Sequence, residues 1–227
     1  MSGKTYVIMP VYNEASVAAD VIRSVAGCFK NIICVNDGSS DDTSNVIKMT
    51  KAVLVEHPFN LGAGAATQTG IEYALLDKKA KYFITIDGDG QHDIKDAVKM
   101  LDYLKSNNLD IVIGSRFLGS SYNMNFPKRL LLNIAKVFSK MDSGIALTDP
   151  HIGLRVFNRN FAEHLKITMP DFAHASEVVR RIKEGNYKWG EVPVTVTYSD
   201  YSKAKGQPML NAINISFDLV LQRIYKK

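Results

Sequence analysis

Residues 81–93 read KYFITIDGDGQHD and join an apolar run, residues 82–86, to two aspartates one residue apart, Asp87 and Asp89. A short run of β-branched and aromatic residues predicts a buried strand. In an open α/β sheet the ligand crevice lies beyond the carboxyl ends of the strands, so both carboxylates are predicted at its rim. Such a pair binds Mg²⁺ or Mn²⁺ together with substrate phosphates, although a solvated turn with interleaved glycines is the alternative.

Strand-then-helix units surround this stretch. Residues 7–11 predict a first strand, and apolar residues at helical spacing follow it. A second strand over residues 32–35 ends at Asp37, in a loop of the kind that caps a helix. Further strands are predicted over residues 52–55 and 110–114. This alternation predicts an α/β fold with a mostly parallel central sheet covered on both faces.

The length of 227 residues suits a single domain over residues 1–227, and no change of composition marks a linker. Residues 118–128 predict a mobile loop. The small residues from Gly62 to Ala66 permit close backbone approach before a helix, but they lack the third glycine of a dinucleotide fingerprint. Cys28 and Cys34 are both predicted to be small buried hydrophobes.

The net charge of +5 favours anionic partners, such as nucleotide phosphates or an acidic membrane surface. The sequence contains no recognised nucleic-acid-binding motif, so no nucleic-acid partner is predicted. No secretory segment precedes the first strand and no apolar run approaches 18 residues, which predicts a cytoplasmic protein. Residues 208–227 predict an amphipathic helix, whose apolar stripe either packs on the sheet or lies in a membrane interface.

An ordered set of motifs covers nearly the whole chain. They are VIMPVYNE (7–14), VNDGSSDDT (35–43), NLGAGAATQTG (60–70), IDGDGQHD (86–93), DIVIGSRF (110–117), TDPHIGLRVFNR (148–159), EVPV (191–194) and YSKAKGQ (201–207). This set resembles the family-2 inverting glycosyltransferases, and among them the polyprenyl-phosphate sugar transferases similar to dolichyl-phosphate mannosyltransferase. The resemblance implies a single-domain nucleotide-sugar transferase A-type (GT-A, Rossmann-like) fold and a divalent cation, Mg²⁺ or Mn²⁺.

The resemblance also implies a nucleotide site. Pro10, Tyr12 and Glu14 match residues that line the nucleoside pocket, and Asp37 matches one that accepts a hydrogen bond from the base. Asn60 and Gly62 match the loop after the third strand. Each of these residues also has a purely structural explanation, as a turn former, a helix cap or part of the core.

The implied metal and phosphate ligands follow the fourth and fifth strands. Asp87 is expected near the ribose or a metal-bound water, while Asp89 and Gln91 are expected to coordinate the metal. Arg116 matches a basic residue that engages the donor or acceptor phosphate, with a surface ion pair as the alternative. His92 is expected to orient a ligand carboxylate.

On the acceptor side, Glu177 lies where related transferases carry a carboxylate, and it is favoured over His174 as a functional residue. Asp149 and Arg155 match the family less closely. Lys203 and Lys205 are expected to meet phosphate in a loop over the donor, with a solvated basic loop as the alternative. The arginine that related enzymes carry before this loop is absent, which leaves the acceptor open.

Three functions follow from these motifs. The favoured one is metal-dependent transfer of a sugar from a UDP- or GDP-linked donor to polyprenyl (dolichyl or undecaprenyl) phosphate. The enzyme would then dock peripherally at the cytoplasmic membrane face, by its terminal stripe or through a small membrane subunit. The second is a transferase of the same fold that extends a surface polysaccharide or lipid-linked glycan on a hydroxyl group. The third, a non-catalytic nucleotide-binding subunit, is disfavoured by the joint presence of Asp37, Asp87, Asp89 and Arg116.

Overall fold

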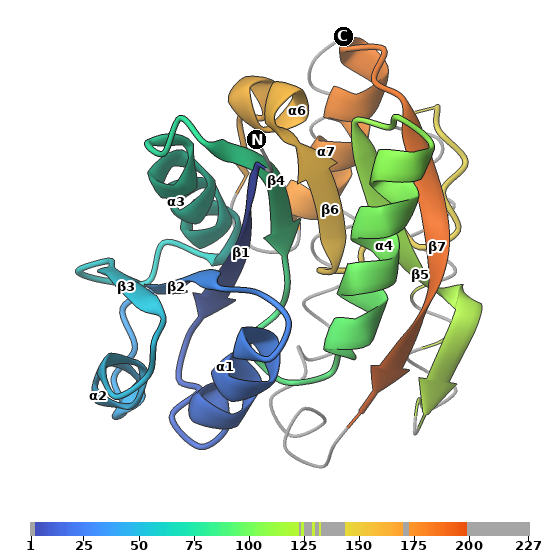
Figure 1. The fold of residues 1–227 in the computed structure, drawn as a ribbon. Coiled ribbons are helices and arrows are strands. Elements are labelled where there is room, and N and C mark those ends of the chain that lie inside the picture. Colours follow the sequence, from blue (N-terminus) through green and yellow to red (C-terminus); the bar gives the residue numbers. More distant parts are fainter. Residues whose placement is uncertain are drawn as a thin grey trace, which may run out of the picture.

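The computed structural model describes residues 3–122, 124, 129, 132, 144–169 and 173–198. These residues form one seven-stranded sheet flanked by helices (Figure 1). The strands are β1 (Lys4–Val11), β2 (Asn31–Asn36), β3 (Val53–Glu56), β4 (Ala80–Thr85), β5 (Ile111–Tyr122), β6 (Arg155–Asn158) and β7 (Trp189–Thr197). The helices are α1 (Ala18–Ala26), α2 (Thr43–Lys48), α3 (Ala63–Leu75), α4 (Ile94–Ser106), α6 (Arg159–His164) and α7 (Ala173–Glu184).

The direction in which successive strands are added to the sheet reverses once, between β3 and β4. The strand order is β3-β2-β1-β4-β6-β5-β7, and among the described strands β6 alone runs antiparallel to its neighbours. The chain moves outward from β1 to β3 and then returns past β1 to β4. Because crossovers between parallel strands are right-handed, α3 covers the face opposite α1 and α2. The mostly parallel α/β fold is thus confirmed, and a ligand crevice is expected at the reversal, where β1 and β4 end.

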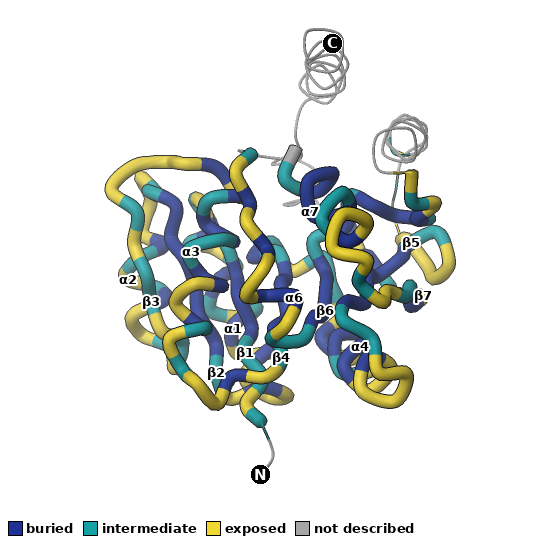
Figure 2. The backbone as a smooth tube through the Cα atoms, turned by 90° about the horizontal axis from the view of Figure 1, so that it is seen from above, coloured by how far each residue is buried: buried dark blue, intermediate teal, exposed yellow. Residues whose placement is uncertain are grey.

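The core lies between the sheet and its helices. The central strands β1, β2, β4 and β6 and the first half of β5 carry most of the buried strand residues, because helices cover both faces of the sheet there (Figure 2). Three aromatic rings connect β4, β6 and α6. Phe83 stacks on Phe157 with ring centroids 5.8 Å apart, and Phe161 meets Phe157 edge-on at 5.6 Å. These contacts fix β6 against β4, below the predicted active-site edge.

The extent of β5 shows that the predicted loop over residues 118–128 was wrong in its first part. Residues 118–122, predicted as the start of a mobile loop, continue β5 and pair with β7 from Ser120↔Thr195 to Tyr122↔Thr197, after a register shift. The rest of that predicted loop, except Met124, lies outside the described residues. The segment lacks a local strand signal because residues 118–122 are exposed. Its conformation depends on β7, which is distant in sequence.

The two cysteines differ from each other. Cys34 is buried in β2 as predicted, whereas Cys28 is exposed, so the prediction that both are buried was wrong. Cys28 follows the end of α1 in a turn, where its amide donates to the carbonyl of Val25 and its side chain remains outside the core.

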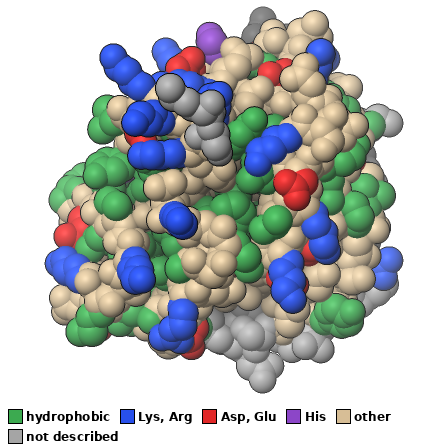
Figure 3. Space-filling view, in the orientation of Figure 1, with side chains coloured by type: hydrophobic (Ala, Val, Ile, Leu, Met, Phe, Trp, Pro, Cys, Tyr) green, Lys and Arg blue, Asp and Glu red, His purple; other side chains and the backbone are tan. Residues whose placement is uncertain are grey.

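Two membrane predictions concern the surface. No helix among the described residues is long and apolar enough to cross a membrane. The predicted amphipathic helix over residues 208–227 lies outside the described residues. On the face seen in Figure 3, Lys and Arg side chains are spread over the surface and interrupted by apolar and polar groups.

Candidate active site

The predicted nucleotide and metal residues gather at the reversal of strand order. Tyr12 directly follows β1, Asp37 directly follows β2, and Asp87 comes two residues after β4. The ends of these strands are joined by backbone hydrogen bonds, because the amide of Asp37 donates to the carbonyl of Val11 at 2.9 Å. The carboxyl ends of three parallel strands thus bring these predicted residues to one edge of the sheet.

Asp87 lies half exposed at this edge. Its side chain retains 50% of its accessible surface, and its Oδ2 is 3.3 Å from Nε2 of the buried His92 side chain. Burial opposes ionisation, but the charges of His92, Arg155 and His174 outweigh this effect and hold the pKa of Asp87 below its usual value. The carboxylate is therefore ionised at neutral pH and faces solvent on one side.

Asp89 is partly buried and is held by Gln91. The Gln91 amide N–H donates to Asp89 Oδ1 at 3.1 Å, and the Gln91 side-chain amide donates to Oδ2. Burial, followed by the negative charge of Asp87, raises the pKa of Asp89 to about 6. Two neighbouring carboxylates that repel each other form a favourable site for a divalent cation, since the cation relieves the repulsion.

The donor set fits a cation that is shared with a substrate. Among the described residues, no group of three or more His, Cys, Asp and Glu side chains is arranged to hold a metal ion. The two aspartates can supply the one or two carboxylates that Mg²⁺ takes from a protein when phosphate oxygens complete its coordination. The site therefore suits a metal that arrives with a diphosphate.

Asp37 holds the loop that connects β3 to α3. Its carboxylate accepts hydrogen bonds from the amides of Leu61 at 2.9 Å and Gly62 at 2.8 Å, and from His57 Nδ1 at 2.7 Å. His57 Nε2 lies 3.0 Å from Thr69 Oγ1, which ties the loop to α3. Asp37 is only 3% exposed, so these hydrogen bonds assign it to shaping the loop, and its contact with a base stays a prediction.

The remaining predicted nucleotide residues lie in β1, just after it, and in the loop after β3. Pro10 pairs with Val35 across β1 and β2. Tyr12 is 40% exposed, whereas Glu14 is buried and its amide donates to Thr43 Oγ1 at 2.8 Å. Asn60 Oδ1 accepts from the Gly62 amide at 3.1 Å, and Gly62 has a φ of 92°, which is the left-handed region that favours glycine.

Arg116 is buried in a charged network and is not a surface ion pair. Its Nε donates to Asp149 Oδ2 at 2.6 Å, and its Nη1 donates to Tyr198 Oη at 2.7 Å. The Arg116 side chain keeps 9% of its exposure and that of Asp149 keeps 1%. Asp149 is fixed in turn through Glu191, which accepts from the amides of Thr148 and Asp149. Arg116 is therefore pre-organised, with part of its guanidinium left for another anion.

Glu177 differs from the acceptor-side carboxylate that was predicted. Its side chain is completely buried. Oε2 accepts from the amides of Thr168 at 2.8 Å and Met169 at 3.0 Å, and Oε1 accepts from Thr168 Oγ1 at 2.8 Å. Burial opposes its ionisation, but these hydrogen bonds and Arg180 lower the pKa of Glu177. The contacts brace residues 167–169 against α7, and they leave the carboxylate poorly suited to accept a proton.

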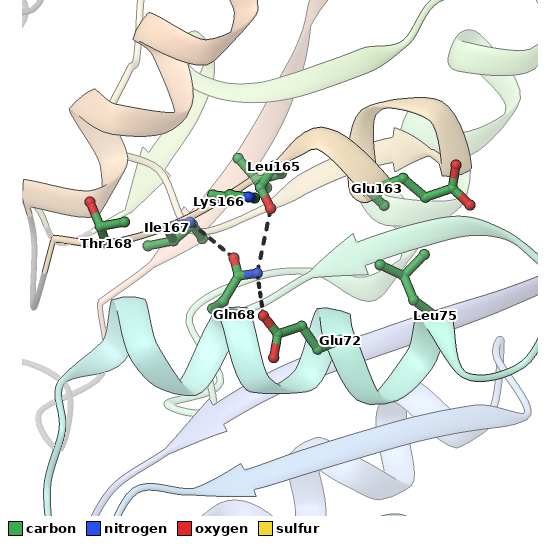
Figure 4. Close-up of a pocket in the computed structure, with 9 residues that line it drawn as sticks. Gln68, Glu72, Leu75, Glu163, Leu165, Lys166, Ile167 and Thr168 are labelled. Carbon is green, nitrogen blue, oxygen red and sulfur yellow. Dashed lines mark hydrogen bonds between the residues drawn. The ribbon is translucent and has the colours of Figure 1, made fainter.

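The braced segment also borders a surface hollow of about 320 Å³ between α3 and the chain after α6. In Figure 4, Gln68 points into this hollow and bridges its two sides. Its side chain accepts from the Ile167 amide at 3.0 Å and donates to Glu72 at 2.9 Å. None of the predicted site residues lines the hollow, so it is separate from the candidate active site.

Several residues of the site were missed or left without a role by the sequence analysis. His57, Tyr198 and Glu191 all hold predicted site residues through tertiary contacts. His57 alone had a local signal, because it lies two residues after the predicted strand over residues 52–55. Lys203 and Lys205 lie outside the described residues, so their predicted phosphate contact stays a prediction.

Comparisons with known proteins agree with this architecture. An uncharacterized protein of Methanocaldococcus jannaschii, MJ1222, is 32% identical over 97% of this chain and 92% of its own length. The UDP-N-acetylglucosamine–dolichyl-phosphate N-acetylglucosaminyltransferase of Methanococcus voltae is 28% identical over 97% of this chain and 96% of its own.

Solved structures share the fold at low identity. The glucosyl-3-phosphoglycerate synthase of Mycobacterium tuberculosis, in complex with Mn²⁺ and UDP-glucose, superimposes with a TM-score of 0.72 at 16% identity, over 96% of this chain and 77% of that one. The family model described as glycosyl transferase family 2 matches residues 6–166. The chain therefore belongs to glycosyl transferase family 2 and is a glycosyltransferase of the GT-A fold.

Proposed function

We propose that this glycosyltransferase moves a sugar from a nucleoside-diphosphate donor to a polyprenyl phosphate, in a reaction that requires Mg²⁺ or Mn²⁺. The observation that carries the proposal is the carboxylate pair after β4, in which Asp87 is half exposed at the edge of the sheet and Asp89 is held by Gln91. The relative from M. voltae, named for a dolichyl-phosphate acceptor, and the fold relative with Mn²⁺ and UDP-glucose support this choice of substrates.

In this proposal Asp89, with Gln91 beside it, holds the cation, and Asp87 is directed to the ribose or to a metal-bound water. When bound, a divalent cation neutralises negative charge on the departing nucleoside diphosphate. Asp37 keeps the loop of residues 57–62 in place and accepts one hydrogen bond from the base. Tyr12, half exposed beside it, together with Pro10 and Glu14, forms the nucleoside pocket.

Arg116 contributes a fixed positive charge. Its guanidinium is already oriented by Asp149 and Tyr198, so it requires no reorganisation when charge develops on a phosphate. Such pre-organised charges lower the barrier because the cost of orienting them was met on folding. We assign Arg116 to a donor or acceptor phosphate, with Lys203 and Lys205 as further phosphate contacts.

The burial and the hydrogen bonds of the Glu177 carboxylate favour a phosphate acceptor. A phosphate is already an anion at neutral pH and attacks without a strong general base, whereas a hydroxyl needs a base. The carboxylate predicted for that task is buried and engaged by Thr168 and Met169. We therefore assign Glu177 to bracing residues 167–169 and favour the phosphate over the hydroxyl acceptor. A lipid acceptor further implies peripheral membrane docking, through residues 208–227 or a small membrane subunit.

A transfer assay tests this proposal. Radiolabelled UDP- and GDP-sugars are offered with Mn²⁺ or Mg²⁺ to a short-chain polyprenyl phosphate, with and without EDTA. Label should enter the lipid phase only with metal, and the Asp89→Ala variant should lose transfer. The matched control is Asp102→Ala, which removes an exposed carboxylate of α4 and should keep full activity.

The other outcomes distinguish the alternatives. If a donor binds but no label reaches the lipid, the phosphate acceptor is refuted and hydroxyl acceptors become the next substrates to offer. Binding of a nucleotide sugar without transfer to any acceptor would indicate the non-catalytic subunit. Full activity of Asp89→Ala would exclude the assigned metal site.

A further inference from the structure

The turn that enters β6 lies directly against the Asp87 carboxylate. Gly153 is in this turn, two residues before β6 begins. A Cβ atom added to Gly153 would lie 2.2 Å from both carboxylate oxygens of Asp87 and 2.4 Å from the carboxylate carbon. Ordinary contact begins at 3.4 Å, so Asp87 can keep its position only while residue 153 has no side chain.

Gly153 is itself held from several sides, so the backbone cannot yield. Its carbonyl accepts a hydrogen bond from Thr85 Oγ1 at 2.9 Å, which joins it to the end of β4. Ile152 and Leu154 on either side are fully buried, and the Leu154 carbonyl accepts from the Gly114 amide at 3.1 Å. A larger residue would therefore displace the half-exposed aspartate and not the buried turn.

A buried cation follows this turn. Arg155 is opposite Thr85 in the pairing of β4 with β6, and it is only 3% exposed. Within the described part of the chain, its Nε has no hydrogen-bond partner and its Nη2 reaches only the Pro150 carbonyl, at 3.4 Å. Its charge attracts both Asp87 and Asp149 without forming a close ion pair to either. Arg155 thus favours the ionised carboxylate but does not fix its direction, which is left to packing against Gly153 and to His92.

We propose that Gly153 is a positioning residue for the cation and the nucleoside diphosphate: the absence of a side chain there sets the direction of the Asp87 carboxylate. This inference rests on the proposed function, because it matters only if Asp87 faces a metal-bound nucleotide. A methyl group at residue 153 would push each oxygen away by roughly 1 Å, and a displacement of that size in a preorganised site can cost about a hundredfold in rate.

The test is a double-mutant cycle between residues 87 and 153. The variants are Gly153→Ala, Asp87→Ala and both together, and Gly27→Ala is the matched control. Gly27 has an ordinary helical φ of −65°, and an added Cβ there would meet its nearest atom, a carbonyl oxygen of α1, at 3.2 Å. Binding of Mn²⁺ in the presence of UDP, and separately GDP, is measured by the loss of the free Mn²⁺ signal in electron paramagnetic resonance.

We expect Gly153→Ala to weaken Mn²⁺ binding at least tenfold in the presence of the preferred nucleotide, and Gly27→Ala to leave it unchanged. In the Asp87→Ala background, Gly153→Ala should change Mn²⁺ binding less than twofold, because the carboxylate that the methyl group displaces is already gone. Equal effects of Gly153→Ala in both backgrounds would overturn the inference, as would wild-type affinity of the single variant.

A second readout needs no ligand and separates this inference from the proposed function. The same four variants are unfolded with urea. Gly153→Ala should lower the urea midpoint of the wild-type protein, and it should not lower the midpoint of Asp87→Ala. Absence of this coupling would refute the contact between Gly153 and Asp87. If instead the coupling is present but the wild type binds neither nucleotide with Mn²⁺, the proposed function fails while the contact stands.

Discussion

Replacement of Glu177 tests whether this buried carboxylate is a brace or a base. In Glu177→Gln the amide oxygen can take the place of Oε2 and accept from the amides of Thr168 and Met169, while the NH₂ group donates to Thr168 Oγ1. The shape and the hydrogen bonds survive, and only the charge facing Arg180 and Arg181 is lost. Charge-assisted hydrogen bonds are about twice as strong as neutral ones, so the expected loss is about 1–2 kcal/mol in the free energy of unfolding.

Glu177→Ala should be more damaging. It leaves the amides of Thr168 and Met169 without their acceptor, at about 1–2 kcal/mol each, which predicts a loss of about 3 kcal/mol. Urea unfolding followed by the fluorescence of the single tryptophan, Trp189, measures both variants. The lowered pKa of Glu177 fixes the sign of the pH dependence: its contribution to stability is fully present above the ordinary glutamate pKa of 4.5 and is lost as the pH falls below that value.

Activity completes the test. If Glu177 braces residues 168 and 169, Glu177→Gln should keep most of its transfer activity per folded molecule. In both variants the loss of activity should then parallel the loss of folded protein. If Glu177 is instead a general base, Glu177→Gln and Glu177→Ala should abolish transfer to the same extent. Loss of transfer by a fully folded Glu177→Gln protein would refute the bracing role.

Four further predictions concern the rim of the sheet. Because the pKa of Asp89 is raised to about 6, the affinity for Mn²⁺ should rise between pH 5 and 7. Asp87→Ala removes one cause of the raised pKa and should move this rise to lower pH. An affinity for Mn²⁺ that does not change with pH would contradict the raised pKa of Asp89. The same raised pKa means that ionisation of Asp89 lowers the free energy of unfolding as the pH rises from 3.8 through 6. At pH 7 the free energy of unfolding of Asp89→Asn should therefore be higher than that of the metal-free wild type by about 3 kcal/mol, with no difference below pH 4, as measured by urea unfolding. His57→Ala removes a hydrogen bond to Asp37, which holds the loop of residues 57–62. Because hydrogen bonds to charged groups are worth about 1.5–3 kcal/mol, steady-state kinetics should show the KM for the nucleotide sugar raised about tenfold, with little change in kcat. Tyr198→Phe removes the hydroxyl that accepts a hydrogen bond from Arg116. Loss of one hydrogen bond of about 1–1.5 kcal/mol should lower kcat/KM about fivefold to tenfold. Full activity would show that Asp149 alone orients Arg116.

The parts of the fold that the sequence predicted are those with local signals. The run before Asp87 identified β4, and the alternation of strands and helices identified the parallel sheet. The two strands that it missed, β6 and β7, depend on partners far away in the chain. The four residues of β6 are too few for a period, and β7 is held by its pairing with β5, which begins at Ile111↔Trp189 and so joins residues far apart in the sequence.

The same distinction applies to the candidate site. Asp87 and Asp89 could be found from one segment, because both the strand and the carboxylates lie within it. The environment of Glu177 could not, since a carboxylate on an amphipathic helix has the same local sequence whether it faces solvent or two distant amides. Gly153 illustrates the limit most clearly: a glycine in a turn suggests backbone freedom, whereas here its value lies in the space that it leaves for Asp87.

The reversed direction of β6 has a consequence for how the site is assembled. Because β6 runs against β4 and β5, it begins at the edge of the sheet where its neighbours end. The turn of residues 149–154, which leads into β6, therefore brings Asp149 to Arg116 and Gly153 to Asp87. A parallel strand in the same place would begin at the opposite edge, so one antiparallel strand lets a short turn supply contacts that several parallel strands could not.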